Sequence, residues 1–337
     1  MTPAARSELD PAQLRQILLA CGIGAKLMRS CAPLTGGTYN STYRVGLSDG
    51  TAVVLKVAPD PAAPALSYER DLMRTEVVFY RAAAGRLPVP RVLHAGVDRT
   101  VAPRDFLLMT ECPGGDWRSR GGQLDAADRA RLRKELGTMV AALHEVTGDG
   151  FGYPQLGLEP SWSAAFLRMV DAVLADAERF AAPLPEPPAG IRNLFHAEAD
   201  LLDTVRRPTL VHFDLWDGNI LIDATAGAAR ILGVVDGERA FWGDPLAELV
   251  SLALFGRIEQ DEDFLSGYRS AGGAVTFDPS AQRRLALYRA YLYLIMLVEA
   301  TPRRFSGPEH DRQARFVERH LVRALSTLSR PEAGSHP

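Results

Sequence analysis

The sequence predicts an α+β protein in which a small lobe, built on an antiparallel sheet with one main helix, precedes a larger, mostly helical lobe. Up to residue 111, short apolar runs alternate with turn residues, which is typical of hairpin strands. From residue 126 onward, apolar residues recur mainly at helical spacing. Segment 112–116 (Cys-Pro-Gly-Gly-Asp) reads as a flexible connector, so we place the domain boundary between residues 1–112 and 113–330.

The small lobe is predicted from turn signals and apolar alternation. A Gly-Gly turn and a Ser-Asp-Gly turn separate the first strands, and the main helix begins at Ser67 and ends before Gly85 and Pro88. A short amphipathic segment at residues 11–20 precedes the sheet. The expected strands are residues 27–34, 42–47, 52–57, 91–97 and 105–111.

The large lobe is predicted from helical periodicity, interrupted only by strands near residues 210–236. The segment of residues 331–337 is short and polar and contains two prolines, so we expect it to be disordered. The expected helices are residues 126–146, 162–180, 190–205, 245–255, 281–300 and 310–328.

Composition excludes several classes of protein. The chain has 337 residues and a formal net charge of −3, which gives no electrostatic reason to expect nucleic-acid or anionic-membrane binding. Cys21, Cys31 and Cys112 have no metal-ligand spacing and suggest free thiols in a reducing compartment. We see no secretory signal and no apolar run long enough to span a bilayer, so we expect a cytoplasmic protein.

The turn at residues 34–42 (Leu-Thr-Gly-Gly-Thr-Tyr-Asn-Ser-Thr) is a candidate phosphate-binding loop. Glycines let backbone N–H groups approach phosphate oxygens, and nearby hydroxyl and amide groups add donors. The alternative is a plain hairpin turn, because the G-K-[ST] signature of a P-loop is absent. The candidate nucleotide-binding residues here are Gly36, Gly37, Thr38, Asn40 and Ser41.

Lys56 lies inside the apolar run of residues 53–57, where a lysine often simply points to solvent. Glu76 favours another interpretation, because it falls on the apolar stripe of its helix and a buried carboxylate needs a partner. We expect Lys56 to be that partner and to reach the phosphates of a nucleotide. Glu69 is the alternative partner, one helical stripe away.

The central segment, residues 210–221 (Leu-Val-His-Phe-Asp-Leu-Trp-Asp-Gly-Asn-Ile-Leu), has the H-x-D-x-x-x-x-N spacing of kinase catalytic loops. It predicts Asp214 as catalytic base and Asn219 as a ligand of Mg²⁺. An isolated aspartate in a loop is more often a turn or cap residue, but the flanking apolar residues indicate a buried loop. His212 could be an acid/base group, and we favour the alternative that it braces the loop.

Asp236 ends an apolar strand at residues 231–235, a position that suits a metal ligand at the edge of a cleft. Glu238 could provide a further carboxylate near the metal or face solvent, and the sequence leaves both open. Asp244 precedes a proline and a helix, so its default role is N-capping.

In this order, these motifs resemble the aminoglycoside phosphotransferase superfamily, which includes fructosamine, choline and macrolide kinases and has a protein-kinase-like fold. The resemblance covers about residues 34–248. Residues 212–219 look like the family's Brenner motif, residues 235–240 and 243–245 like its metal-binding segment, and residues 107–111 like its hinge strand. It implies ATP or GTP and Mg²⁺ as cofactors, with adenine meeting the backbone of Thr110 and Cys112.

The departures from related patterns are informative. Phe213 stands where protein kinases carry arginine, Asp236-Gly237-Glu238 replaces their Asp-Phe-Gly, and no Ala-Pro-Glu activation segment follows. Members of the family often carry glycine at the position of Phe213 and an aromatic residue at that of Gly237, so the local loop geometry should differ.

The sequence therefore predicts a small-molecule O-phosphotransferase whose acceptor is an antibiotic, a sugar or amino sugar, or a nucleoside-like molecule. Residues 162–180 and 259–268 are the expected walls of the acceptor site. A protein kinase and a nucleotide-binding pseudokinase are the alternatives. Nothing in the sequence decides between ATP and GTP, between a resistance and a metabolic role, or among oligomeric states.

Overall fold

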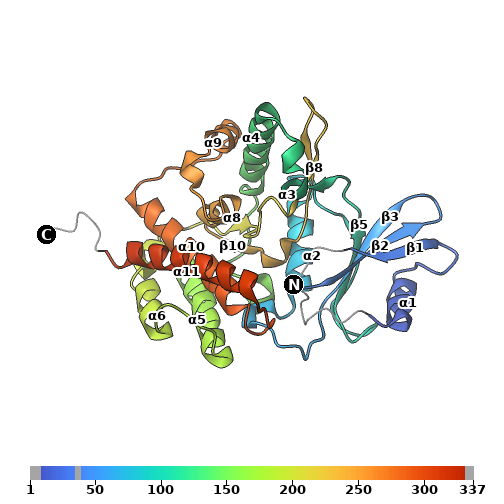
Figure 1. Cartoon of the computed structure of the whole chain (residues 1–337), viewed down its shortest axis with the longest axis horizontal. Coiled ribbons are helices and arrows are strands. Elements are labelled where there is room, and N and C mark those ends of the chain that lie inside the picture. The colour runs from blue at the N-terminus through green and yellow to red at the C-terminus, as the bar shows by residue number, and fades with distance from the viewer. Residues whose placement is uncertain (1–8, 35–38, 331–337) are drawn as a thin grey trace.

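The structure, a computed structural model, describes residues 9–34 and 39–330, which form a small sheet-based lobe and a larger helical lobe (Figure 1). The sheet is antiparallel with strand order β1-β2-β3-β5-β4. Its strands are β1 (Met28–Pro33), β2 (Ser41–Leu47), β3 (Ala52–Val57), β4 (Val92–Gly96) and β5 (Phe106–Thr110).

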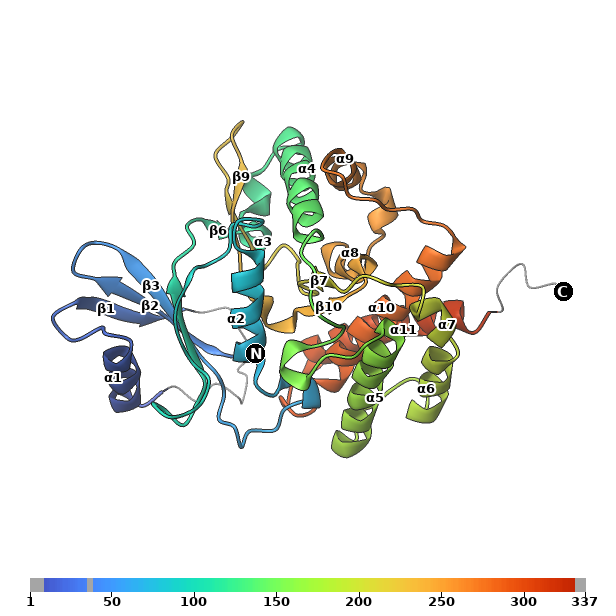
Figure 2. The same cartoon turned by 180° about the vertical axis from the view of Figure 1, so that it is seen from behind.

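Side chains along β3 point alternately to the two faces of the sheet, and each face packs against a different helix. Val53, Leu55 and Val57 pack into one cluster with α1 (Pro11–Ala20), whereas Val54 packs into the cluster that contains α2 (Leu72–Ala83). Successive side chains point to opposite faces, so Lys56 shares the face of Val54 and is directed toward α2. Figure 2 shows α1 on the outer side of the sheet and α2 between the sheet and the helical lobe.

The connector between the lobes is more ordered than expected. Its residues Gly115–Asp116 form β6, which pairs with β8 (Ile220–Asp223), and β8 pairs with β9 (Arg230–Val234). Gly114 has φ +97°, and a Cβ there would lie 2.7 Å from the carbonyl oxygen of Ile222. The proline and glycines therefore allow a close approach of two backbones.

The helical lobe is built around the buried helix α10 (Pro279–Val298) and a close helix pair, α4 (Ala126–Leu143) with α9 (Glu262–Ser270). A Cβ on Gly267 would lie 1.9 Å from the carbonyl oxygen of Lys134, so glycine is required where α4 and α9 meet. The other elements are α3 (Trp117–Arg120), α5 (Trp162–Phe180), α6 (Pro188–His196), α7 (Ala199–Leu202), α8 (Glu248–Leu252), α11 (Pro308–Leu328), β7 (Thr209–Val211) and β10 (Phe241–Gly243).

Three expected helices differ from the structure. The helix expected from Ser67 begins only at Leu72, because residues 67–69 form a separate 3₁₀ turn and Asp71 is left-handed with φ 58°. The helix expected at residues 190–205 is split into α6 and α7. The one expected at residues 245–255 is a 3₁₀ turn followed by the short α8. Of the described residues, no helix is both long and apolar enough to cross a membrane.

Candidate functional site

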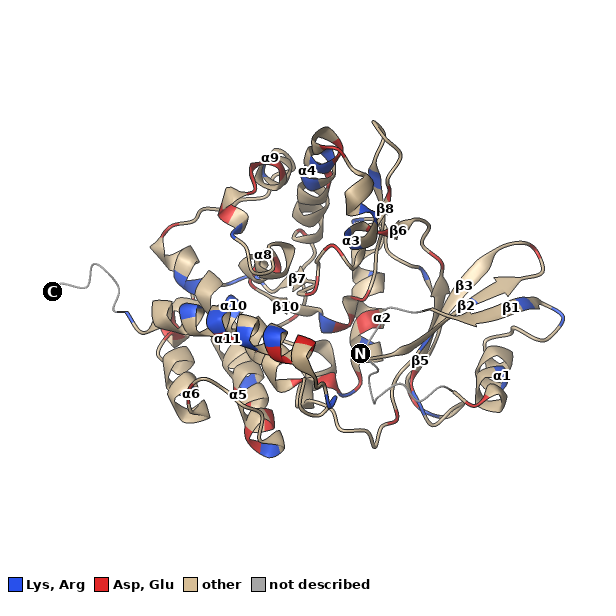
Figure 3. Ribbon diagram, viewed as in Figure 1, with Lys and Arg blue, Asp and Glu red and all other residues tan. Residues whose placement is uncertain are grey.

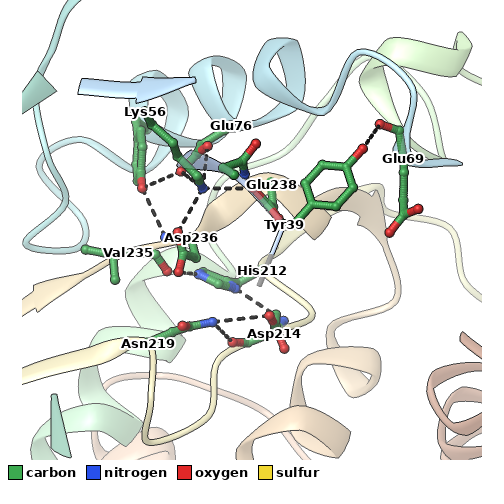
Figure 4. A network of polar contacts seen from close by, with 12 residues as sticks. Tyr39, Lys56, Glu69, Glu76, His212, Asp214, Asn219, Val235, Asp236 and Glu238 are labelled. Atoms are coloured by element: carbon green, nitrogen blue, oxygen red, sulfur yellow. Dashed lines mark hydrogen bonds and ion pairs between the residues drawn. The ribbon is translucent and has the colours of Figure 1, made fainter. Parts of the chain in front are cut away.

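The site begins with a buried ion pair between the sheet and α2. Lys56 on β3 is 3% exposed, and its Nζ lies 2.9 Å from the carboxylate of Glu76 on α2 (Figure 4). The hydroxyl of Tyr80, one turn further along α2, donates to Glu76 Oε1 at 2.8 Å. The predicted pairing of Lys56 with Glu76 is confirmed, and the alternative partner, Glu69, binds Arg303 instead.

Two further carboxylates from the helical lobe meet the same ammonium group. Lys56 Nζ lies 2.8 Å from Asp236 Oδ1 and 2.8 Å from Glu238 Oε2. Burial alone would lower the pKa of Lys56, but the three carboxylates prevail and raise it well above its ordinary value. Burial works to raise the pKa of Asp236, yet the Lys56 ammonium prevails there and the pKa is lowered. Both groups are therefore charged at neutral pH.

Asp236 lies in a strained turn after β9. Its φ of 61° is left-handed, a conformation that non-glycine residues rarely adopt, and the Tyr80 hydroxyl accepts its backbone N–H at 3.1 Å. Its side chain remains 45% exposed. The turn therefore directs a charged carboxylate between Lys56 and open space.

The loop between β7 and β8 carries the other two predicted residues. Asn219 Nδ2 donates to the backbone oxygen of Asp214 at 2.8 Å and to its Oδ2 at 3.2 Å. Burial raises the pKa of Asp214 to about 7, and the guanidinium of Arg239 acts in the opposite direction. Asp214 is thus a carboxyl group poised near neutral pH, a property suited to a base.

His212 braces this loop, as the favoured interpretation predicted. Its Nδ1 accepts the backbone N–H of Asp214 at 3.2 Å, so Nε2 carries the proton and donates to the carbonyl oxygen of Val235 at 3.0 Å. Burial lowers the pKa of His212 to about 4, which keeps the ring neutral. The histidine thereby ties the loop of Asp214 to the strand that leads into Asp236.

The unusual residues Phe213 and Gly237 have a structural explanation. Phe213 is fully buried, with its ring centroid 5.0 Å from that of Phe241, so it anchors the loop in the core. A Cβ on Gly237 would lie 2.1 Å from the ring of Phe79, whose centroid is 4.9 Å from that of His212. Phe79, from α2, fills the space that an aromatic residue at position 237 would need.

The candidate phosphate loop is only partly described. Asn40 Nδ2 donates to Glu238 Oε2 at 2.6 Å, and Ser41 begins β2. Glu238 is 15% exposed in its side chain and bonded to Lys56 and Asn40, so the solvent-facing interpretation is wrong. The predicted residues Gly36, Gly37 and Thr38 lie outside the described residues.

The predicted adenine contacts lie at the end of β5. The backbone N–H of Thr110 donates to the carbonyl oxygen of Arg91 at 3.0 Å, so this N–H is not free for a ligand. Cys112 follows outside any strand, and its backbone makes no hydrogen bond within the described parts of the chain. Its side chain packs on Gly233 of β9, where an added Cβ would come within 2.8 Å of Cys112 Cβ.

Asn219 and Asp236 offer oxygens of the kind that Mg²⁺ binds. Because Asn219 Nδ2 donates to Asp214, its Oδ1 is left as a possible ligand, and Asp236 is partly exposed. Among residues 9–34 and 39–330, no group of three or more His, Cys, Asp or Glu side chains is placed to hold a metal. Two protein ligands completed by nucleotide oxygens and water suit Mg²⁺, so the residues fit the ion.

Sequence reasoning missed two buried residues of the site. Glu248 accepts the backbone N–H groups of His212 at 2.7 Å and Phe213 at 3.2 Å, which fixes the start of the loop. Arg239 binds Glu299 at 2.8 Å and faces Asp214 electrostatically. For Glu248 the available signal was a charge among apolar residues at the start of α8, whereas Arg239 stands in the charged run Asp-Gly-Glu-Arg, where no local pattern distinguishes it. Asp244, by contrast, caps its turn as predicted and accepts from Leu246 N at 3.0 Å.

Comparison with known proteins supports the kinase-like interpretation. The profile of a family described as "Phosphotransferase enzyme family" matches residues 30–288. A probable ketoamine kinase of Lactiplantibacillus plantarum is 24% identical over 283 residues, 79% of this chain and 86% of that protein. One from Synechocystis is 32% identical over 168 residues, 46% of this chain and 52% of that protein.

A further relative is much longer than this chain. Mouse acyl-CoA dehydrogenase family member 10 is 24% identical over 257 residues, which cover 75% of this chain but only 23% of that protein. The chain thus spans under a quarter of this relative and about half of the Synechocystis kinase.

Solved structures show the same fold. A protein assigned as a fructosamine-3-kinase of Thermobifida fusca has a TM-score of 0.62 at 21% identity, covering 88% of this chain and 94% of that one. The aminoglycoside phosphotransferase APH(4)-Ia, in complex with AMP-PNP and hygromycin B, has a TM-score of 0.63 at 17% identity, covering 95% of this chain and all of that one. The chain belongs to the phosphotransferase enzyme family and has its two-lobed, protein-kinase-like fold.

Proposed function

We propose that the protein is a small-molecule kinase that transfers the γ-phosphoryl group of ATP or GTP to a hydroxyl group of its acceptor. One observation carries the proposal: the 2.8 Å contact between Lys56 and Asp236 unites the two lobes beside the loop of Asp214 and Asn219. Phosphoryl transfer needs this combination of a cation, metal ligands and a base in one place.

Lys56 has the role of holding the α- and β-phosphates, and Glu76 fixes its position. The backbone near Thr110 and Cys112 would meet the adenine edge, and the turn that includes Asn40 and Ser41 would cover the phosphates. Residues 1–112 would then form the nucleotide-binding lobe and residues 113–330 the catalytic and acceptor-binding lobe. The buried Lys56–Glu76 pair supports this division of labour, because a buried ion pair requires fixed partners.

Asn219 and Asp236 would hold Mg²⁺, which when bound neutralises charge on the nucleotide phosphates. Asp214 would orient the acceptor hydroxyl and take its proton as the bond from the γ-phosphorus to the acceptor oxygen forms and the bond to the β-phosphate oxygen breaks. A positioned base of this kind contributes about 10²–10⁴ in rate.

The comparisons suggest several chemical classes as candidates for the acceptor. Relatives described as ketoamine kinases make ketosamines candidates, and structural neighbours bound to hygromycin B or gentamicin make amino-sugar antibiotics candidates. Sugars, nucleoside-like molecules and amino alcohols complete the panel to be screened, with nucleotide consumption and mass spectrometry of the phosphorylated product as readouts.

The first test replaces Asp214 by Asn. We expect turnover to fall by at least about 10²-fold while Mg-nucleotide still binds, because the variant loses the base and keeps Lys56, Asn219 and Asp236. Asp223→Asn, at an exposed turn of β8, is the matched control and should retain activity. Near-normal turnover by the Asp214→Asn variant would refute the assignment. Tight nucleotide binding by the wild type without product across the panel would favour a pseudokinase.

A further inference from the structure

A cleft lies beside the loop between β7 and β8, which contributes Asp217 to its lining. It has a volume of about 620 Å³ and is lined by α3, α4, the loop after Asp214 and the chain between α8 and α9. This volume is in the range of small-molecule sites. Figure 3 shows the arginine-bearing parts of α3, α4 and the α8–α9 connection in the same upper region of the molecule. Its charged lining residues are Arg118, Arg129, Arg133, Arg257, Asp217 and Asp261.

Four arginines against two aspartates give this lining a formal charge of +2. One pair is neutralised internally, because Arg133 Nε binds Asp261 Oδ2 at 2.7 Å. Asp217 makes no ion pair with a described residue. The formal charge of +2 is therefore left by Arg118, Arg129 and Arg257 together with the unpaired carboxylate of Asp217.

Arg118 and Arg129 make no ion pair with a described residue, and Arg257 makes only a long one, with Glu259. The Arg118 guanidinium lies over the Trp216 ring at 5.3 Å. Arg129 donates to the carbonyl oxygens of Gly121 at 3.0 Å and Leu124 at 3.1 Å. The nearest carboxylate oxygen to Arg257 is 3.9 Å away, and its side chain is 62% exposed. The guanidinium groups of Arg118 and Arg257 therefore keep N–H donors for an anion.

The other notable cavity, about 420 Å³ near Tyr39, does not share this property. Four arginines line it (Arg70, Arg99, Arg179 and Arg303), and four acids line it as well (Asp60, Glu69, Asp71 and Asp105), so its formal charge is zero. The unmatched positive charge distinguishes the cleft at Arg118.

This cleft is joined directly to the catalytic loop. The backbone N–H of Arg118 donates to the carbonyl oxygen of Asp217 at 3.1 Å. Asp217 follows Asp214 by three residues, in a tight turn closed by Trp216 N to Asp214 O at 3.0 Å. Three residues span at most about 11 Å even when extended, so a group in the cleft and a hydroxyl at Asp214 can belong to one small molecule.

We propose that this cleft binds an anionic group, a phosphate or carboxylate, on the acceptor that Asp214 deprotonates. The planar guanidinium donors of Arg118 and Arg257 match the oxygens of either group. The inference rests on the proposed kinase function and narrows its acceptor to molecules that carry both a hydroxyl and an acidic group. A polycationic acceptor is disfavoured by the same charges.

The test compares probes that differ mainly in the acidic group: ribose with ribose 5-phosphate, and glucose with glucuronate. Saturating Mg-AMP-PNP is present throughout, so the nucleotide site is filled. The readout is the rise of the thermal unfolding midpoint with probe concentration, which yields an apparent Kd. We expect a saturable rise with ribose 5-phosphate or glucuronate and a much weaker one with the neutral sugars.

The double variant Arg118→Gln/Arg257→Gln should raise the apparent Kd of the anionic probes by about tenfold or more, because two charge-assisted contacts are lost. Arg312→Gln/Arg315→Gln, on exposed positions of α11, removes the same charge elsewhere and should leave the Kd unchanged. Arg118→Lys keeps the charge without the planar fork and should fall between. An unchanged Kd in the Arg118/Arg257 variant, or no saturable rise in the wild type, overturns the proposal.

A kinetic measurement separates this inference from the proposed function. For an acceptor found in the screen, the double variant should raise KM about tenfold with kcat nearly unchanged, as for lost uniform binding. A neutral acceptor with unaltered KM in the variant would refute the anion site and leave the kinase function standing. Specific anion binding without phosphoryl transfer to any acceptor would support the anion site and refute the kinase function.

Discussion

At the scale of single residues, Asp214 combines two opposing influences. Burial disfavours its charged form and raises its pKa to about 7, whereas the nearby Arg239 guanidinium favours the charged form. Arg239 is itself held in place by Glu299 at 2.8 Å, and both side chains are 13% exposed. This makes Arg239 a positioning residue that sets how much of Asp214 is ionised at neutral pH.

A pH profile tests this arrangement. A base acts only when ionised, so kcat/KM should fall about tenfold per pH unit on the acid side of a limb at or below pH 7, since a bound cation favours the ionised carboxylate. Arg239→Gln should move the limb to higher pH, because the influence that lowers the Asp214 pKa is gone. Arg312→Gln, remote and exposed, is the control. A limb that stays in place or moves to lower pH would contradict the role of Arg239.

The residues that could be predicted from the sequence are those with a local pattern. Helical spacing placed Glu76 on a buried stripe, and the need of a buried carboxylate for a partner pointed to Lys56 on the neighbouring strand. Glu238 stayed undecided, because its contacts with Lys56 and Asn40 come from parts of the chain some 200 residues apart. Glu248 was missed for the same reason: its two backbone partners lie 36 and 35 residues away, and no local pattern reveals them.

At the scale of elements, the contact between α2 and the turn after β9 links the two lobes. Phe79 on α2 is fully buried, and its ring lies against Gly237 and edge-on to His212. The same helix supplies Glu76 to Lys56, and Tyr80 binds the backbone of Asp236. A change in this contact should therefore affect both the stability of the fold and the geometry of Asp236, the proposed metal ligand.

Gly237→Ala tests this contact. The added Cβ would lie 2.1 Å from a ring carbon of Phe79, so the ring or the turn must shift, at a cost of about 1–3 kcal/mol in the free energy of unfolding. Adding Phe79→Leu should recover part of the loss by freeing space. Urea denaturation measures both effects, with Gly190→Ala, in open space on α6, as the control. Equal stability of Gly237→Ala and wild type would show that the turn adapts without cost.

Element boundaries followed the sequence where caps were local. The helix predicted at residues 162–180 is α5, whose N-cap Ser161 accepts the N–H of Ala164. The helix expected from Ser67 failed at its start because the buried Glu69 accepts Leu66 N at 2.7 Å and binds Arg303, which holds residues 67–69 in a separate turn. Arg303 is 234 residues away from Glu69 in the sequence, and local helix propensity cannot predict such a contact.

At the scale of the whole molecule, an ion pair far along the chain from the connector also joins the two lobes. Arg303, after α10, binds Glu69 of the small lobe and also Glu299 at 3.1 Å. The Tyr39 ring lies 5.3 Å from the same guanidinium, and its hydroxyl donates to the backbone of Glu69 at 3.1 Å. The order of the two lobes was predictable from periodicity. The contact of Arg303 with Glu69 was not, because it joins residues that are far apart in the sequence.

The stability of the whole fold should depend on pH below neutrality, because a buried histidine must stay neutral in the folded state. His144, after α4, bonds through Nδ1 to the Tyr268 hydroxyl of α9 at 2.8 Å, and its buried Nε2 has no hydrogen-bond partner among the residues that the structure describes. Burial lowers the pKa of His144 to about 3, below the value of about 6.5 expected in the unfolded chain. The neutral ring therefore contributes stability that is fully present above pH 6.5 and is lost as pH falls toward 3.

The loss for one such group is about 1.4 kcal/mol per pH unit, so between pH 6.5 and 5.0 the free energy of unfolding should fall by about 2 kcal/mol through His144 alone. His144→Phe should remove that part of the pH dependence, because the phenyl ring cannot titrate, while losing the Tyr268 bond at every pH. Urea unfolding at pH 7.5 and 5.0 gives the difference for each protein. If the variant and the wild type lose equal stability over this interval, protonation of His144 in the unfolded chain does not cause the loss. The neutral His212 is then the next residue to replace.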